Sequence, residues 1–218
     1  MNPDLRRATY DEIVDFVFDH EPQDDVDDKW YWRELEDDVQ IEPYQAIQFL
    51  TRLCDAPGGL VARFTLRQIA EGVTFLFGGR GQFDFGEQLW NADLPWPERR
   101  ACIRMIPNLY SQVFELDEDG IGSCAFMLWD SIAYGYYCGN RDPLKSADDA
   151  RVQDAIVEAL ESMLRSDHPE TLRGAIHGLG HLQHRESNRA IRELLSSKRV
   201  IDPTVRAYGA QVLEGHFQ

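Results

Sequence analysis

Two short stretches in the last third of the chain decide the fold: DHPETLRGA at residues 167–175 and DPTVRAYGA at residues 202–210. Each begins with an aspartate suited to cap a helix and has a proline in the first helical turn. Each continues with an aliphatic residue and an arginine, then with small residues that allow a neighbouring helix to approach closely. The pattern predicts two similarly built helices whose arginines, Arg173 and Arg206, lie 33 residues apart.

Apolar residues at helical spacing extend this prediction along the chain. A capping box at Thr9–Glu12 begins the first predicted helix, and Pro43 is placed to begin the second. The helices expected from these signals cover residues 9–19, 43–54, 65–77, 97–114, 123–138, 148–165, 169–179, 190–195 and 203–213. No comparable run of alternating residues predicts a β-strand, so the chain is expected to be all-α.

The two helix openings resemble those of HEAT repeats, in which the aspartate, proline and arginine recur from repeat to repeat. The interval of 33 residues is shorter than the usual period of about 40–47 residues, and the proline-to-arginine spacing differs by one residue between the copies. The resemblance implies an α-α superhelix of stacked antiparallel helix pairs, with about ten helices. One domain spanning residues 1–218 is expected, in which an irregular acidic helical region (1–138) precedes HEAT-like helix pairs (148–216). This likeness implies an architecture and not an activity.

Composition is that of a globular protein rather than a disordered one. Of the 218 residues, 43% are hydrophobic and 11% aromatic. The longest apolar stretches, 73–77 and 124–129, are too short to cross a bilayer, and the N-terminus has no apolar signal region. Four widely spaced cysteines without a C-x-x-C pair favour buried thiols over disulfides or a zinc ribbon. These features predict a cytoplasmic protein.

Negative charge is concentrated near the N-terminus. Residues 1–50 hold 15 acidic and 4 basic residues, a net charge of −11, whereas the whole chain has a net charge of −16. Such a field repels nucleic acids and anionic membranes and speeds association with a basic surface. The alternative is that the acidic end merely keeps the protein soluble.

An aromatic and acidic segment at residues 30–38 is the expected partner-binding surface. Three consecutive aromatic residues cannot all face one core from a helix, so at least one of Trp30, Tyr31 and Trp32 is predicted to be exposed or packed on a neighbouring segment. The other interpretation is that two of the three rings pack in the core. Exposed aromatic rings surrounded by carboxylates suit a protein interface with a basic partner. The residues proposed to make it are Trp30, Trp32, Glu34, Glu36, Asp37 and Asp38.

Three histidines on one predicted helix are the alternative site. His177, His181 and His184 stand at i, i+4 and i+7, which places them on one helical face. Neutral imidazoles one turn apart can bind zinc, but the glutamate that follows the first histidine in helical metalloprotease motifs is replaced by Gly178. The other interpretation is structural, with these histidines lining a groove or bonding to neighbouring helices.

No other segment has the pattern of a catalytic site. The glycine-rich stretch at residues 78–81 lacks the lysine and hydroxyl residue of a phosphate loop, and no local signature marks a nucleophile. The first functional hypothesis is therefore a non-enzymatic module that binds a basic protein without a cofactor. Size, charge and architecture are similar to those of immunity proteins that block bacterial toxins, and a structural adaptor without an inhibitory role is the other form of this hypothesis. The second hypothesis is a metal-binding scaffold or metal-dependent enzyme that uses the three histidines.

Overall fold

The computed structural model describes residues 3–25, 27–33, 35, 39–78, 85–116 and 122–216, and the side chains of all of these except residues 122 and 123. These residues form eleven α-helices and no β-strand, which confirms the predicted all-α class. The helices are α1 (Tyr10–Phe18), α2 (Trp30–Arg33), α3 (Pro43–Asp55), α4 (Leu66–Phe77), α5 (Trp96–Met105), α6 (Pro107–Gln112), α7 (Gly122–Tyr137), α8 (Ala147–Met163), α9 (Pro169–Leu182), α10 (Ser187–Ser196) and α11 (Pro203–Leu213). Three short 3-10 helices connect them: η1 (Pro57–Ala62), η2 (Gly86–Trp90) and η3 (Phe114–Leu116).

Local sequence signals begin several of these helices. The predicted capping box forms at α1, where the Glu12 amide donates to Thr9 Oγ1 at 3.3 Å and the Thr9 amide donates to Glu12 Oε2 at 2.7 Å. Thr65 and Gln68 make the same pair of bonds at the start of α4. The amide hydrogens of the first helical turn have no partner within the helix. Proline has no amide hydrogen, so it loses no hydrogen bond when it occupies this turn. Prolines occupy this position in α3, α9 and α11 as predicted: Pro43, Pro169 and Pro203.

Two expectations about helix ends were wrong. The helix predicted over residues 97–114 is divided into α5 and α6, and Pro107 begins the second of them. A proline inside a helix removes a backbone hydrogen bond and clashes with the preceding turn, which explains the break. At α9, Asp167 is not the cap; it accepts a hydrogen bond from Arg199 at 2.8 Å instead. Asp202 does cap α11, where it accepts from the Thr204 amide at 2.7 Å.

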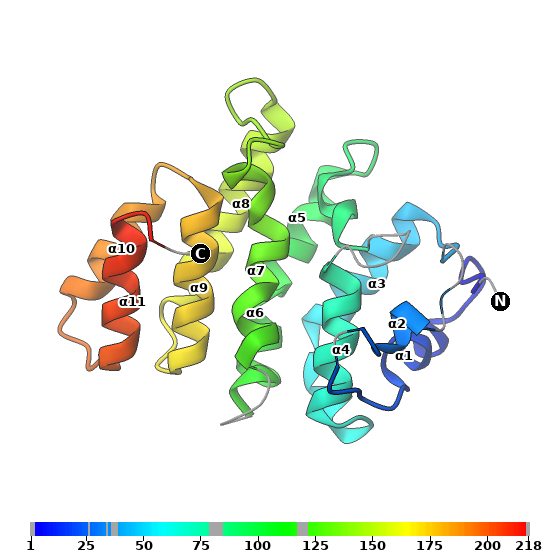
Figure 1. The fold of residues 1–218 in the computed structure, drawn as a ribbon. Coiled ribbons are helices and arrows are strands. Elements are labelled where there is room, and N and C mark those ends of the chain that lie inside the picture. The colour runs from blue at the N-terminus through cyan, green and yellow to red at the C-terminus, as the bar shows by residue number, and fades with distance from the viewer. Residues whose placement is uncertain are drawn as a thin grey trace.

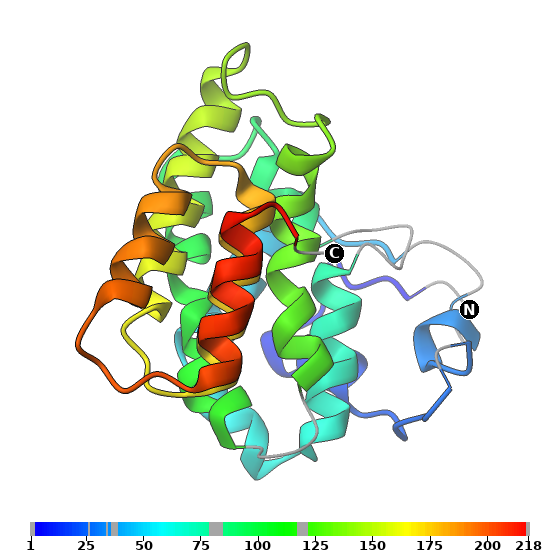
Figure 2. The same ribbon diagram turned by 60° about the vertical axis from the view of Figure 1, so that its left-hand side comes forward.

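The longer helices lie in two layers (Figure 1). Helices α4, α7, α9 and α11 pack side by side in chain order, and α3, α5 and α8 form a second row behind them. Figure 2 shows α11 at the near end of the first row, with α7 and α4 beyond it. Helix α10 contacts both α9 and α11, and α1 packs on α4 at the opposite end. One hydrophobic core runs between the layers from Leu5 to Val212.

Helices α7 and α9 approach each other closely because glycines of α9 face α7. A β-carbon at Gly174 would lie 3.0 Å from the Ala125 carbonyl oxygen, and one at Gly178 would lie 2.7 Å from the Trp129 β-carbon. The small residues after Arg173 therefore do what the sequence pattern predicted of them. This close contact brings polar side chains of the two helices together.

A partly buried ion pair links two helices of the second row, α5 and α8. The Arg99 guanidinium of α5 is fully buried and donates to both carboxylate oxygens of Asp148 in α8, at 2.7 and 2.9 Å. It also donates to the Leu89 carbonyl at 3.2 Å. Burying a charge is costly unless it is paired and hydrogen-bonded, so these bonds are needed where Arg99 lies.

The cysteines are all unpaired thiols, as expected, but they are not all buried. Cys54 and Cys102 lie in the core, Cys124 is partly buried and Cys138 is exposed. Burial raises the pKa of Cys102 to about 12 and that of Cys124 to about 11. Across the described residues, the helices lack the length and apolar character that a membrane span requires.

Candidate functional site

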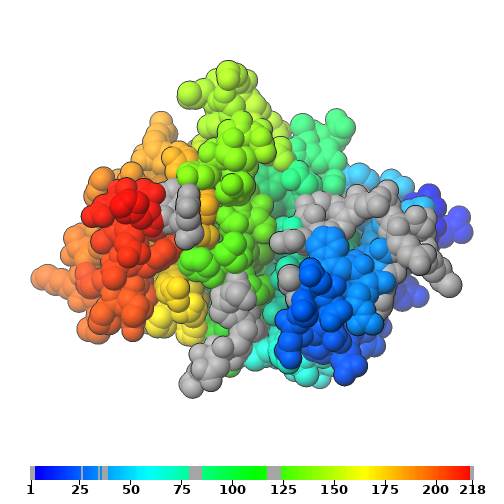
Figure 3. Space-filling model, viewed as in Figure 1, coloured from blue at the N-terminus to red at the C-terminus, as the bar shows by residue number. Residues whose placement is uncertain are grey.

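The acidic N-terminal region presents its charge to solvent. The structure describes eleven acidic residues between positions 3 and 50, and all eleven are exposed: Asp4, Asp11, Glu12, Asp15, Asp19, Glu21, Asp24, Asp25, Asp27, Asp28 and Glu42. Some are paired, since Arg63 bonds Asp15 and Arg67 bonds Asp24. Figure 3 shows the N-terminal segments (blue) at one end of the molecule, opposite the C-terminal helices (red). The net negative charge is thus concentrated on one end of the surface.

The three consecutive aromatic residues divide between core and surface. Trp30 is 3% exposed, and its ring stacks on His20 with 3.8 Å between ring centroids. Tyr31 is also buried, whereas Trp32 is 45% exposed. One ring is exposed and two pack in the core, which agrees with both interpretations of the sequence. Trp30, which was expected in the partner-binding surface, is one of the two buried rings. The reason is geometric, because successive residues of α2 point in different directions.

The other acids proposed for this surface are Glu34, Glu36, Asp37 and Asp38, and they lie outside the described residues. Within the described part of the segment, Trp32 and Arg33 are exposed. Lys29 is drawn inward, where it pairs with the buried carboxylate of Glu71 at 2.6 Å. This pair removes one of the few positive charges from the N-terminal surface.

The histidines of α9 do not share one face, because the helix ends before the third of them. Gln183 adopts a left-handed conformation with φ of 53°, and α9 stops at Leu182. His184 therefore turns away and donates through Nε2 to Asp154 of α8 at 3.0 Å. His177 and His181 remain one turn apart on the helix, and both are buried. The predicted set of three histidines is reduced to two.

Asp130 of α7 lies next to both buried histidines, His177 and His181. His181 Nε2 lies 2.9 Å and His177 Nε2 lies 3.9 Å from the same oxygen, Asp130 Oδ1. The three potential ligand atoms lie within 4.8 Å of one another. We call Asp130, His177 and His181 the histidine–aspartate cluster. The spacing of the histidines predicted two of its members, and the carboxylate comes from a different helix.

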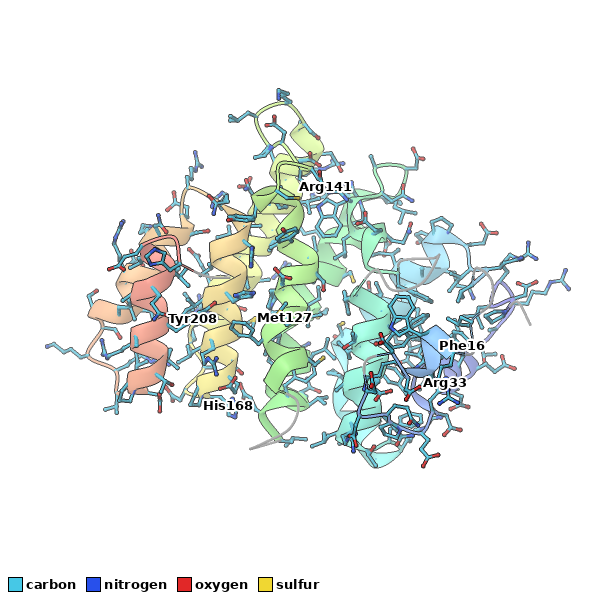
Figure 4. All side chains as sticks on the ribbon, in the orientation of Figure 1. Phe16, Arg33, Met127, Arg141, His168 and Tyr208 are labelled. Carbon is cyan, nitrogen blue, oxygen red and sulfur yellow. The ribbon has the colours of Figure 1, made fainter. Side chains whose placement is uncertain are left out.

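The surroundings of His177 determine its protonation state and its hydrogen bonding. Burial, together with the adjacent His181 imidazole, lowers the pKa of His177 to about 4, so this ring is neutral at neutral pH. Its Nδ1 is hydrogen-bonded to the Tyr208 hydroxyl of α11 at 2.6 Å, while its Nε2 has no hydrogen-bond partner within the described part of the chain. In Figure 4, Tyr208 lies between α11 and α9, on the same face as Met127 of α7.

Aromatic side chains surround the cluster. Phe126 lies against His177 with 4.1 Å between ring centroids, and Tyr134 and Tyr137 meet His181 edge-on at 5.5 and 5.3 Å. Both tyrosines are themselves partly exposed, so the cluster lies just beneath the surface of the first row.

Sequence reasoning missed Asp130, although a signal was present. Among residues 122–137, which form α7, Asp130 is the sole charged residue. An isolated carboxylate in an otherwise apolar helix needs a polar partner, and that partner is not specified by the local sequence.

Searches of known protein families, curated proteins and solved structures gave no match to this chain.

Proposed function

We propose that this chain is a non-enzymatic module that binds a basic protein through its acidic and aromatic N-terminal surface. The observation that carries the proposal is the exposure of all eleven described acidic residues between positions 3 and 50. Clustered surface carboxylates attract a positively charged partner over a distance of about one Debye length and so speed encounter.

Trp32 supplies the second element of the proposed interface. Large aromatic side chains are enriched among the residues that dominate binding energy, and they act best at the centre of a surface from which water is excluded. An exposed tryptophan beside a strongly acidic segment fits this role. Glu34, Glu36, Asp37 and Asp38 are proposed to surround it.

The proposal also covers the type of helical fold and the cellular compartment. We propose that the two helical layers belong to a HEAT-type superhelix, supported by the proline that α9 and α11 share in their first turns, and that the protein acts in the cytoplasm. The size and charge of the protein favour a role as an immunity or inhibitor protein that binds a basic effector.

The test compares the wild type with two variants that each lose four negative charges. One variant carries D24N, D25N, D27N and D28N, all at exposed N-terminal positions. The control carries D93N, D154N, E193Q and E214Q, which are exposed positions in later parts of the chain. Each protein is immobilised and used to capture partners from cells that produce it, at low and moderate salt.

We expect a basic protein that the wild type and the control retain and the N-terminal variant loses. With the purified pair, the N-terminal variant should associate about tenfold more slowly at low salt and depend less on salt. Trp32→Ala should instead speed dissociation and leave the association rate nearly unchanged. If the N-terminal variant and the control behave alike, the proposed surface is not the binding site.

A further inference from the structure

We infer that Asp130, His177 and His181 form a binding site for one divalent transition-metal ion, with Zn²⁺ as the best-fitting ion. This inference is independent of the proposed protein-binding surface, since that surface lies in the first fifty residues. It also replaces the three-histidine site expected from sequence, because Asp130 takes the place of His184.

The distances within the histidine–aspartate cluster suit a small ion. Zinc bonds to imidazole nitrogen and carboxylate oxygen are about 2.0–2.2 Å long, so two ligands of a tetrahedral ion lie about 3.4 Å apart. The observed separations from Asp130 Oδ1 are 2.9 Å to His181 Nε2 and 3.9 Å to His177 Nε2. One distance is about 0.5 Å shorter and the other about 0.5 Å longer than the ideal, so changes of about half an ångström bring both to it.

An unsatisfied buried atom supports a ligand at this place. His177 is only 2% exposed, and its Nε2 has no hydrogen-bond partner among the residues that the structure describes. Buried polar atoms are nearly always bonded, so an orphan of this kind calls for an explanation. A metal ion between the three side chains would satisfy it.

The other nitrogen of His177 is bound in the manner of a metal ligand. A metal-bound histidine commonly donates its second ring N–H to an oxygen, which holds the ring in position. Here His177 Nδ1 lies 2.6 Å from the Tyr208 hydroxyl oxygen. With the hydrogen on Nδ1, that nitrogen donates to Tyr208 and the Nε2 lone pair is available to the ion.

The donor set selects the kind of ion. Two imidazoles and one carboxylate suit zinc and similar first-row ions, whereas magnesium and calcium prefer oxygen ligands alone. Three protein ligands leave a fourth tetrahedral position for water or another molecule. Since the Asp130 side chain is 23% exposed, solvent reaches the cluster from this side.

The experiment measures Zn²⁺ binding to the full chain after treatment with a chelator and its removal. Isothermal titration is expected to show one ion per chain for the wild type. Asp130→Asn and His181→Gln should each weaken binding by at least about 100-fold, and Tyr208→Phe, which removes a supporting oxygen, by about 10–100-fold. His184→Gln is the matched control, because His184 bonds Asp154 outside the cluster, and it should bind like the wild type.

A second measurement keeps the test decisive if a variant does not fold, as judged by circular dichroism. X-ray absorption of the zinc-loaded wild type should show two imidazole ligands and no sulfur. Binding that is absent in the wild type, that survives both Asp130→Asn and His181→Gln, or that lacks imidazole ligands would overturn the assignment. The same holds if His184→Gln abolishes binding.

Discussion

Replacing Asp148 by asparagine is expected to lower the free energy of unfolding by about 3–5 kcal/mol at neutral pH. Arg99 is fully buried between α5 and α8, and Asp148 provides both carboxylate oxygens that accept from it. The asparagine keeps the shape of the side chain but removes its negative charge. A buried guanidinium without a counter-charge is then left in the core, and this uncompensated charge is the source of the loss.

The loss of unfolding free energy in Asp148→Asn should depend on pH. The hydrogen bonds from Arg99, more than any other interaction, hold the pKa of Asp148 below its usual range. A carboxyl group whose pKa is lower in the folded chain stabilises that state fully above the unfolded pKa of about 3.9, and this contribution disappears as the pH falls through the folded value. The difference between wild type and Asp148→Asn should therefore be constant near neutrality and shrink below about pH 4.

A second pair between the same two helices is the control. Arg100 of α5 bonds Glu158 of α8 at 3.0 Å, but both side chains are about half exposed. Solvent screens such a pair, so Glu158→Gln should cost no more than about 1 kcal/mol. Urea unfolding curves of the three proteins at several pH values provide the measurement. Equal losses for the two variants would show that burial of Arg99 does not decide its contribution.

The sequence predicted those parts of the fold that depend on neighbouring residues. Thr9 and Glu12 form their capping box because both partners lie within one turn, and Pro43 begins α3 for an equally local reason. Pro107 was also readable, since a proline inside a helix breaks it. The apolar spacing continues across Pro107, so spacing alone predicts one helix where the structure has α5 and α6.

The candidate metal site could be predicted only in part, because its members come from different helices. The spacing of His177 and His181 places them one turn apart, and that much is local. Their contact with Asp130 depends on how α7 packs against α9, which the pattern of either helix alone does not specify. The expected shared face does not include His184, because the left-handed turn at Gln183 ends α9 before this residue.

The packing of α7 on α9 leads to the second large effect, which is expected from Gly178→Ala. In an exposed helix this change stabilises by about 1 kcal/mol, because alanine has the higher helix propensity. Here the new β-carbon would lie 2.7 Å from the Trp129 β-carbon and 3.0 Å from Leu160 Cδ2. The Trp129 β-carbon is attached to the backbone of α7 and cannot rotate away, so the helices must separate. We expect a net loss of about 1–3 kcal/mol in the free energy of unfolding, as for other overpacked cores.

Gly59→Ala is the control for this prediction, because a β-carbon at Gly59 would meet no atom of the described residues within 4 Å. Its unfolding free energy should stay within about 0.5 kcal/mol of the wild-type value.

The same two variants test whether Zn²⁺ binding depends on the packing of α7 against α9. If α7 and α9 move apart, Asp130 moves away from His177 and His181, so Gly178→Ala should weaken Zn²⁺ binding although it changes no ligand, whereas Gly59→Ala should not. A stabilised Gly178→Ala protein would show that the two helices tolerate a wider separation than the contact at Trp129 implies.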